Sequence, residues 1–135
     1  MMSVWTPYHR ESAMKAIELC KGITSQAEKY RVITEWVTRN FSYDYIRAIT
    51  ISKKNGRPDI PRTWQRRMGI CMDVSSMVVN MMRAVGLKAY FCIGSADNSR
   101  NHAWVEVVIG GELLRFDHSN VNKTKVRQYT VRSRY

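Results

Sequence analysis

The sequence predicts an α+β fold in which N-terminal helices and one central helix pack on a small antiparallel sheet. Three observations support this prediction: apolar residues recur at helical spacing over 9–40, a long apolar run follows Gly69, and two alternating segments flank Gly110-Gly111. The chain has 135 residues, of which 44% are hydrophobic, and this is the size of a domain that buries one core. We therefore expect residues 1–135 to form a single domain.

Two helices are expected ahead of the central one. Residues 9–21 place apolar side chains at helical spacing, and Gly22 ends that segment. A hydroxyl residue followed by an acid within 24–28 is a capping arrangement, and it begins a second helix that continues to residue 40. The apolar face of this second helix, which includes Trp36, is expected to cover the central helix.

Residues 52–68 are predicted to form a basic, turn-rich connection. Proline and glycine residues exclude a regular element until Pro61, which suits the first position of a short helix. That helix carries Trp64 and Gln65, which lie shortly before the central helix. Trp64 is interpreted either as a wall of a binding groove or as an ordinary packing residue.

Residues 69–86, GICMDVSSMVVNMMRAVG, are predicted to form a tight turn followed by a buried central helix. Gly69 allows the turn, Cys71 lies in the first turn of the helix, and Gly86 ends it. The unpaired N–H groups and the positive dipole end at that position stabilise an anion, so they bias a thiol toward thiolate. Cys71 is therefore a candidate nucleophile, and the alternative is a small buried apolar residue.

The second half of the chain is predicted to form the sheet. Residues 87–94 are rich in aromatic and branched side chains and indicate a buried strand. Residues 101–109 and 112–120 are predicted to form a hairpin around Gly110-Gly111. Residues 128–131 are a candidate edge strand.

Two candidate site residues stand at the open end of that hairpin. The start of one hairpin strand lies beside the end of the other, so His102 and Asp117 can be neighbours, as a base and its orienting carboxylate require. Taken singly, His102 could be a strand-edge polar residue and Asp117 a turn former. Glu106 lies about 13 Å further along the strand and is interpreted as a solvated charge or an ion-pair partner. His9 and His118 do not fit the role of the base.

Four separated segments carry a resemblance to a known family. They are G-x-C-x-D at 69–73, M-R-A-V-G-L-K-A at 82–89, N-H-A-W-V-E-V at 101–107 and F-D-H-S at 116–119. In this order they resemble the core of the transglutaminase-like superfamily, a papain-like cysteine fold. Residues 43–45, Tyr-Asp-Tyr, are similar to a segment that often precedes this core in bacterial members.

The resemblance implies thiol chemistry on an acyl group through a triad of Cys71, His102 and Asp117. Papain-like enzymes use a glutamine at a similar distance before the cysteine to hydrogen-bond the oxyanion, so Gln65 is an oxyanion candidate. Trp64 is a second oxyanion candidate. The backbone N–H of Cys71 is the preferred donor, because a helix N-terminus points such groups at developing charge. The calcium-site segments of animal transglutaminases are missing from the sequence, so calcium dependence is not implied.

The resemblance favours a small bacterial-type cysteine peptidase over a protein crosslinker, with a peptide or isopeptide amide bond as the substrate. A non-catalytic module that binds peptide or cell-wall polymer on the same fold is the alternative. No cofactor is expected, and Cys and His do not occur at the pairwise spacing of a metal site. The cysteines Cys20 and Cys92 are interpreted as core residues, without a disulfide framework.

The charge of the chain bears on its partners. Lys and Arg number 22 against 11 Asp and Glu, a net charge of +11. We expect attraction to anionic or cell-wall-associated peptides and proteins, while no nucleic-acid-binding motif accompanies the charge. No run of 18 apolar residues predicts a transmembrane segment. No signal peptide is recognised, so a cytoplasmic location is the default expectation and a removed secretion signal the alternative.

Overall fold

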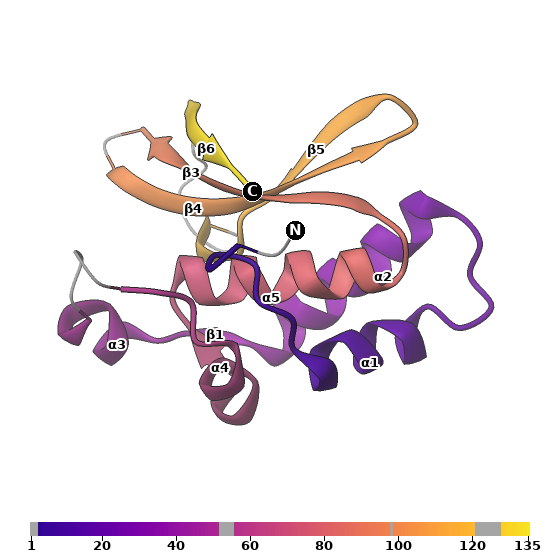
Figure 1. Cartoon of the computed structure of the whole chain (residues 1–135), viewed down its shortest axis with the longest axis horizontal. Helices are drawn as coiled ribbons and strands as arrows, with labels where there is room; N and C mark the ends of the chain where they lie inside the picture. Colours follow the sequence, from indigo (N-terminus) through magenta and orange to yellow (C-terminus); the bar gives the residue numbers. More distant parts are fainter. Residues whose placement is uncertain (1–2, 52–55, 98, 121–127) are drawn as a thin grey trace.

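The computed structural model describes residues 3–51, 56–97, 99–120 and 128–135, and Figure 1 shows its helices against one face of a sheet. The helices are α1 (Arg10–Leu19), α2 (Gln26–Asn40), α3 (Tyr45–Thr50), α4 (Ile60–Arg66) and α5 (Cys71–Ala84), with a 3₁₀ turn η1 (His118–Asn120). The strands are β1 (Ser42–Tyr43), β2 (Met68–Gly69), β3 (Lys88–Ala96), β4 (Ser99–Ile109), β5 (Glu112–Phe116) and β6 (Tyr129–Arg134). The predicted α+β class is confirmed.

The main sheet has the strand order β5-β4-β3-β6, and all neighbouring strands are antiparallel. The turn between β4 and β5 is made by Gly110 and Gly111, whose φ values of 58° and 81° are easily adopted by glycine. The predicted hairpin and the edge strand after residue 127 are thus confirmed, although the second hairpin strand ends at Phe116 and not at residue 120. The short strands β1 and β2 form a separate parallel pair.

Helix α5 lies between the sheet and the other helices (Figure 1). It packs on β3 and β4 on one side and on α1, α2 and α4 on the other, so it is apolar on most of its surface. Met77, Val78, Met81 and Met82 are fully buried, and Gly86 follows the helix with a φ of +83°. The predicted central helix, its burial and its glycine end are confirmed.

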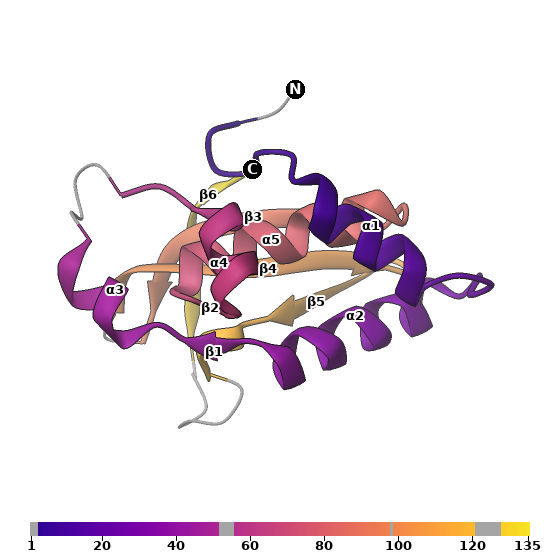
Figure 2. The same ribbon diagram turned by 90° about the horizontal axis from the view of Figure 1, so that it is seen from below.

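The surrounding helices begin at side-chain caps. Ser25 accepts a hydrogen bond from the N–H of Glu28 at 3.2 Å, as the capping sequence predicted. Helices α3 and α4 lie at the end of the molecule where α5 begins, as both views show (Figures 1 and 2). In the described part of the chain, no helix combines the length and apolar composition that crossing a membrane requires.

Candidate active site

Cys71 is the first residue of α5, and its side chain is partly exposed. The preceding residue, Ile70, has an extended backbone, so the chain enters the helix directly from β2. Strand β2 pairs with β1, and the N–H of Asp44 donates to the carbonyl of Gly69 at 3.0 Å. The thiol therefore lies at the positive end of the α5 dipole, next to N–H groups that have no partner within the helix.

Gly69 has a packing role instead of the tight turn that we expected. It belongs to strand β2, and it is not among the described residues with positive φ. A Cβ atom at this position would lie 2.8 Å from Oγ1 of Thr63 and 2.9 Å from Cβ of Asp73. Glycine therefore lets α4 and the first turn of α5 approach each other closely beside Cys71.

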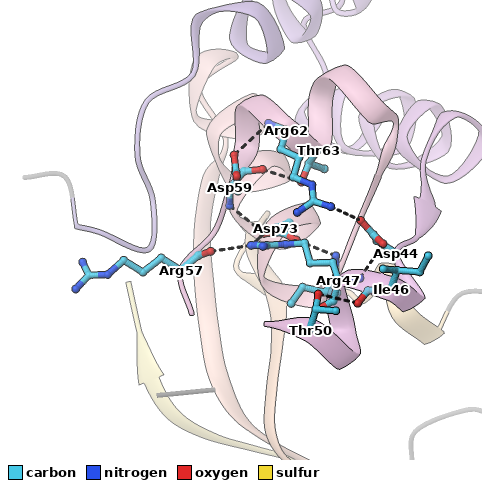
Figure 3. A network of polar contacts seen from close by, with 10 residues as sticks. Asp44, Ile46, Arg47, Thr50, Arg57, Asp59, Arg62, Thr63 and Asp73 are labelled. Carbon is cyan, nitrogen blue, oxygen red and sulfur yellow. Dashed lines mark hydrogen bonds and ion pairs between the residues drawn. The ribbon is translucent and has the colours of Figure 1, made fainter. Parts of the chain in front are cut away.

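The carboxylate of Asp73 lies in a network of polar contacts with Arg47 and Asp59 (Figure 3). Asp73 is fully buried, and its Oδ2 accepts hydrogen bonds from the N–H of Ile70 at 2.9 Å and from Nε of Arg47 at 2.7 Å. Its Oδ1 accepts from Nη2 of Arg47 and from the N–H of Asp59, both at 2.9 Å. One carboxylate thus connects the residue before Cys71 with α3 and with the start of α4.

Arg47, Asp44 and Asp59 complete this network, which was not predicted from the sequence. Arg47 comes from α3, and hydrogen bonds to Asp73 raise the pKa of its guanidinium. Asp44 caps α3 and Asp59 caps α4 through their side chains. The G-x-C-x-D motif contains Asp73, but helix α3 is six residues long and had no clear periodic signal.

His102 and Asp117 are brought together by the hairpin. The pairing of Val105 with Phe116 places His102 just beyond the part of β4 that pairs with β5, and Asp117 directly after β5. Nε2 of His102 lies 2.7 Å from Oδ2 of Asp117. Cys71 lies close enough to the same imidazole to raise its pKa, so the structure brings the three predicted side chains near one another.

The imidazole of His102 is held in its charged form by its neighbours. Burial disfavours the charge, but the hydrogen bonds to Asp117 and Cys71 outweigh it and raise the pKa of His102 to about 10. At neutral pH the imidazole of His102 therefore carries a proton. Since Nε2 faces Asp117, Nδ1 is the ring nitrogen left for Cys71.

Trp104 of β4 contacts the imidazole of His102, and Tyr129 of β6 contacts its partner Asp117. The ring of Trp104 stacks on His102, with 6.0 Å between centroids, and its N–H donates to Glu106 at 3.0 Å. The hydroxyl of Tyr129 donates to Oδ2 of Asp117 at 2.8 Å. Glu106 is 1% exposed and pairs with Arg134, so our expectation of a solvated charge was wrong and that of an ion-pair partner is confirmed.

The two side-chain oxyanion candidates lie on α4. Trp64 is partly buried in an aromatic cluster with Trp36 and Phe41, and the guanidinium of Arg67 lies 4.1 Å from its ring centroid. Gln65 is exposed. Packing accounts for the position of Trp64, and a role of either residue in binding an oxyanion stays a prediction.

The other two cysteines are buried, and the other two histidines make hydrogen bonds within the fold. Burial raises the pKa of Cys92 to about 12 and also raises that of Cys20, so both stay protonated thiols. His9 caps α1 through its ring, and Nε2 of His118 lies 3.0 Å from the carbonyl oxygen of Phe41. Among the described residues, no group of His, Cys, Asp and Glu side chains is arranged to hold a metal ion.

Comparison with known proteins agrees with this arrangement. The family model described as the transglutaminase-like superfamily matches residues 13–118, which is most of the chain. The chain belongs to the transglutaminase-like superfamily. No curated protein matches this transglutaminase-like chain.

Solved structures share the transglutaminase-like fold at low sequence identity. A structure described as a TGase is 20% identical with a TM-score of 0.66, and covers 89% of this chain and 34% of its own. A protein from Cytophaga hutchinsonii, provisionally described as a cysteine protease, is 22% identical with a TM-score of 0.62. The match covers 87% of this chain and 41% of that protein. A Parabacteroides distasonis protein, provisionally described as a protease, is 16% identical with a TM-score of 0.61. The match covers 78% of this chain and 22% of that protein. This chain spans less than half the length of each.

Proposed function

We propose that the chain is a thiol-dependent acyl-transfer enzyme that cleaves peptide or isopeptide amide bonds with Cys71, His102 and Asp117. The observation that supports this proposal is the hydrogen bond between His102 and Asp117 near the thiol at the start of α5, which interacts with the same imidazole. A nucleophile, a base and a group that orients the base are the parts that nucleophilic acyl transfer needs.

The first half of the reaction forms a thioester. The thiolate of Cys71 attacks the amide carbonyl carbon, the S–C bond forms, and the carbonyl electrons move onto the oxygen. The N–H of Cys71 at the helix start donates to this oxyanion, with Gln65 and Trp64 as candidate further donors. As the C–N bond breaks, the imidazolium of His102 passes its Nδ1 proton to the leaving nitrogen, and Asp117 keeps the ring oriented.

The second half releases the product. The neutral imidazole of His102 takes a proton from water, whose oxygen attacks the thioester carbon, and the C–S bond then breaks. This step regenerates the thiolate of Cys71 and the imidazolium, and it releases a carboxylic acid. An amine in place of water would give transfer instead of hydrolysis, with the same residues.

We favour hydrolysis of a peptide or protein substrate over crosslinking. Two of the similar structures are provisionally described as proteases, and one is described as a TGase. The net charge of +11 favours anionic substrates, including acidic or cell-wall-associated peptides. This preference concerns the acyl acceptor and the substrate. The thiol forms the same thioester in hydrolysis and in crosslinking.

The proposed function is tested by mass spectrometry on a peptide library that contains acidic, neutral and basic members. We expect new carboxyl and amino ends from the intact chain and none from the Cys71→Ala variant. An amine adduct in place of a new carboxyl group would identify transfer. Peptide binding without any bond cleavage by the intact chain would support the non-catalytic binding module.

The pH dependence of alkylation tests the thiol and imidazole without a substrate. The pKa of His102 is raised to about 10, so its charge is present at pH 6 and stabilises the thiolate there. We expect iodoacetamide to modify Cys71 at pH 6 at a rate within about threefold of that at pH 8.5, whereas an ordinary thiol with a pKa near 8.5 would react about 100-fold more slowly at pH 6. The His102→Ala variant should react at pH 6 about tenfold more slowly than the intact chain.

The other two cysteines provide an internal control for this measurement. Cys20 and Cys92 are buried and their pKa values are raised, so neither should be modified in the folded chain. Peptide mapping assigns each adduct to its cysteine. Modification of Cys71 that is slow at pH 6 and unaffected by His102→Ala would contradict the thiolate–imidazolium pair.

A further inference from the structure

We propose that Tyr129 is a positioning residue of this site, which holds the carboxylate of Asp117 against His102. The inference rests on the proposed function. It adds a residue from β6, which lies beyond the stretch 13–118 that the family model matches. The residue acts through Asp117 and His102 and is not itself placed at the reacting atoms.

The hydrogen bonds of one carboxylate oxygen carry the inference. Oδ2 of Asp117 lies 2.7 Å from Nε2 of His102 and accepts from the hydroxyl of Tyr129 at 2.8 Å. The side chain of Asp117 is 6% exposed, so water has little access to replace either donor. A carboxylate bound by a single donor can rotate about its own bond, whereas two donors that converge on one oxygen define its direction.

The ring of Tyr129 is itself fixed on two sides. The guanidinium of Arg115 lies 4.0 Å from its centroid, and Trp104 packs edge-on at 4.8 Å. Trp104 also stacks on the imidazole of His102 and is anchored by its hydrogen bond to Glu106. The hydroxyl of Tyr129 is therefore presented by a packed ring and not by a freely rotating side chain.

The backbone at Tyr129 is held as firmly as its ring. Tyr129 pairs with Ala96 of β3, and the preceding Gln128 exchanges two hydrogen bonds with Asp97, both at 2.9 Å. On the following residue, the carbonyl of Thr130 approaches Gly94 so closely that a Cβ there would lie 1.9 Å from the oxygen. Strand β6 is thus fitted against β3 at the point where its tyrosine reaches the site.

The Tyr129→Phe variant tests this inference, because it removes the hydroxyl and keeps the ring. We expect the alkylation rate of Cys71 at pH 6 to fall about tenfold, since a misdirected Asp117 no longer holds His102 toward the thiol. For any peptide that the intact chain cleaves, kcat should fall by a similar factor while KM changes less than about twofold. In proton NMR of the full chain, the signal of the His102 Nε2 proton, which is protected in the bond to Asp117, should broaden or disappear.

Tyr90→Phe is the matched control, because it removes the hydroxyl of a half-buried tyrosine on β3. This variant should keep the intact chain's alkylation rate, kcat and imidazole proton signal. The inference is overturned if Tyr129→Phe leaves the proton signal and the alkylation rate unchanged. It is also overturned if both variants lose thermal stability and alkylation rate alike, since that indicates a structural role only. The NMR and alkylation measurements need no substrate, so they decide on Tyr129 even if the screen finds no cleaved peptide.

Discussion

Replacing Cys71 with alanine is expected to lower the rate of amide cleavage by about 10⁴- to 10⁶-fold, because no other group in the site can form the thioester. The side chain is partly exposed at the start of α5, so the fold should tolerate its removal. The measurement is the single-turnover release of the amine product from a peptide identified in the screen. Circular dichroism and thermal unfolding show whether the variant is folded.

Cys20→Ala is the control for this loss. Cys20 is a buried thiol at the end of α1, on an element that contributes no residue to the site. This variant should retain the cleavage rate of the intact chain even if it unfolds at a lower temperature. A residual rate of Cys71→Ala within about tenfold of the intact chain would contradict the role of the thiol as nucleophile.

Asp73→Asn is expected to lower the free energy of unfolding at pH 7 by about 3–5 kcal/mol, because the variant keeps the volume but removes the anionic partner of Arg47. The side chain of Arg47 is 11% exposed, so water cannot replace that partner. The side-chain amide of the variant would also place an NH₂ group where N–H donors now bind a carboxylate oxygen. These donors include the N–H groups of Ile70 and Asp59. Urea-induced unfolding measures the change.

The ion pair between Arg31 and Glu35 on α2 offers the matched control. Both side chains are about half exposed, and exposed pairs of this kind contribute little to stability. Glu35→Gln should therefore leave the unfolding midpoint where it is in the intact chain. If Asp73→Asn costs no more than Glu35→Gln, the buried network does not stabilise the fold in the way that its geometry indicates.

The Asp73→Asn substitution should also lower the reactivity of the Cys71 thiol. Asp73 binds the N–H of Ile70, the residue directly before Cys71, so a loosened carboxylate loosens the entry to α5. We expect Asp73→Asn to slow the alkylation of Cys71 at pH 6 under conditions in which the variant is still folded. An unchanged rate would show that β1 and β2 hold this segment without the carboxylate.

Local patterns made the central helix and the hairpin predictable. The apolar run that follows Cys71 indicates a buried helix, and the glycine pair 110–111 sets where the chain turns back. Once the turn is known, antiparallel pairing places His102 beside Asp117 with little freedom. The positions of these side chains could therefore be predicted, whereas their meeting with Cys71 was a hypothesis about packing.

Other parts of the site had no local signal. Arg47 and Asp73 are 26 residues apart, and Tyr129 and Asp117 are 12 residues apart with the register of β6 between them. Glu106 follows the alternation of an ordinary strand, which does not reveal that arginine side chains enclose it. Contacts of this kind depend on how the elements pack against one another.

The sequence by itself determined the N-terminal helices, the central helix and the hairpin, and it placed a thiol at a helix start and an imidazole near a carboxylate. These features depend on residues that are close together in the sequence, because side-chain periodicity and the backbone freedom of glycine set the local structure. Only the tertiary structure decided that the imidazole faces the thiol, that Arg47 secures the entry to α5 and that Tyr129 holds Asp117. The physical reason is that a buried polar group must find its partner among whatever side chains packing brings near, however distant they are along the chain.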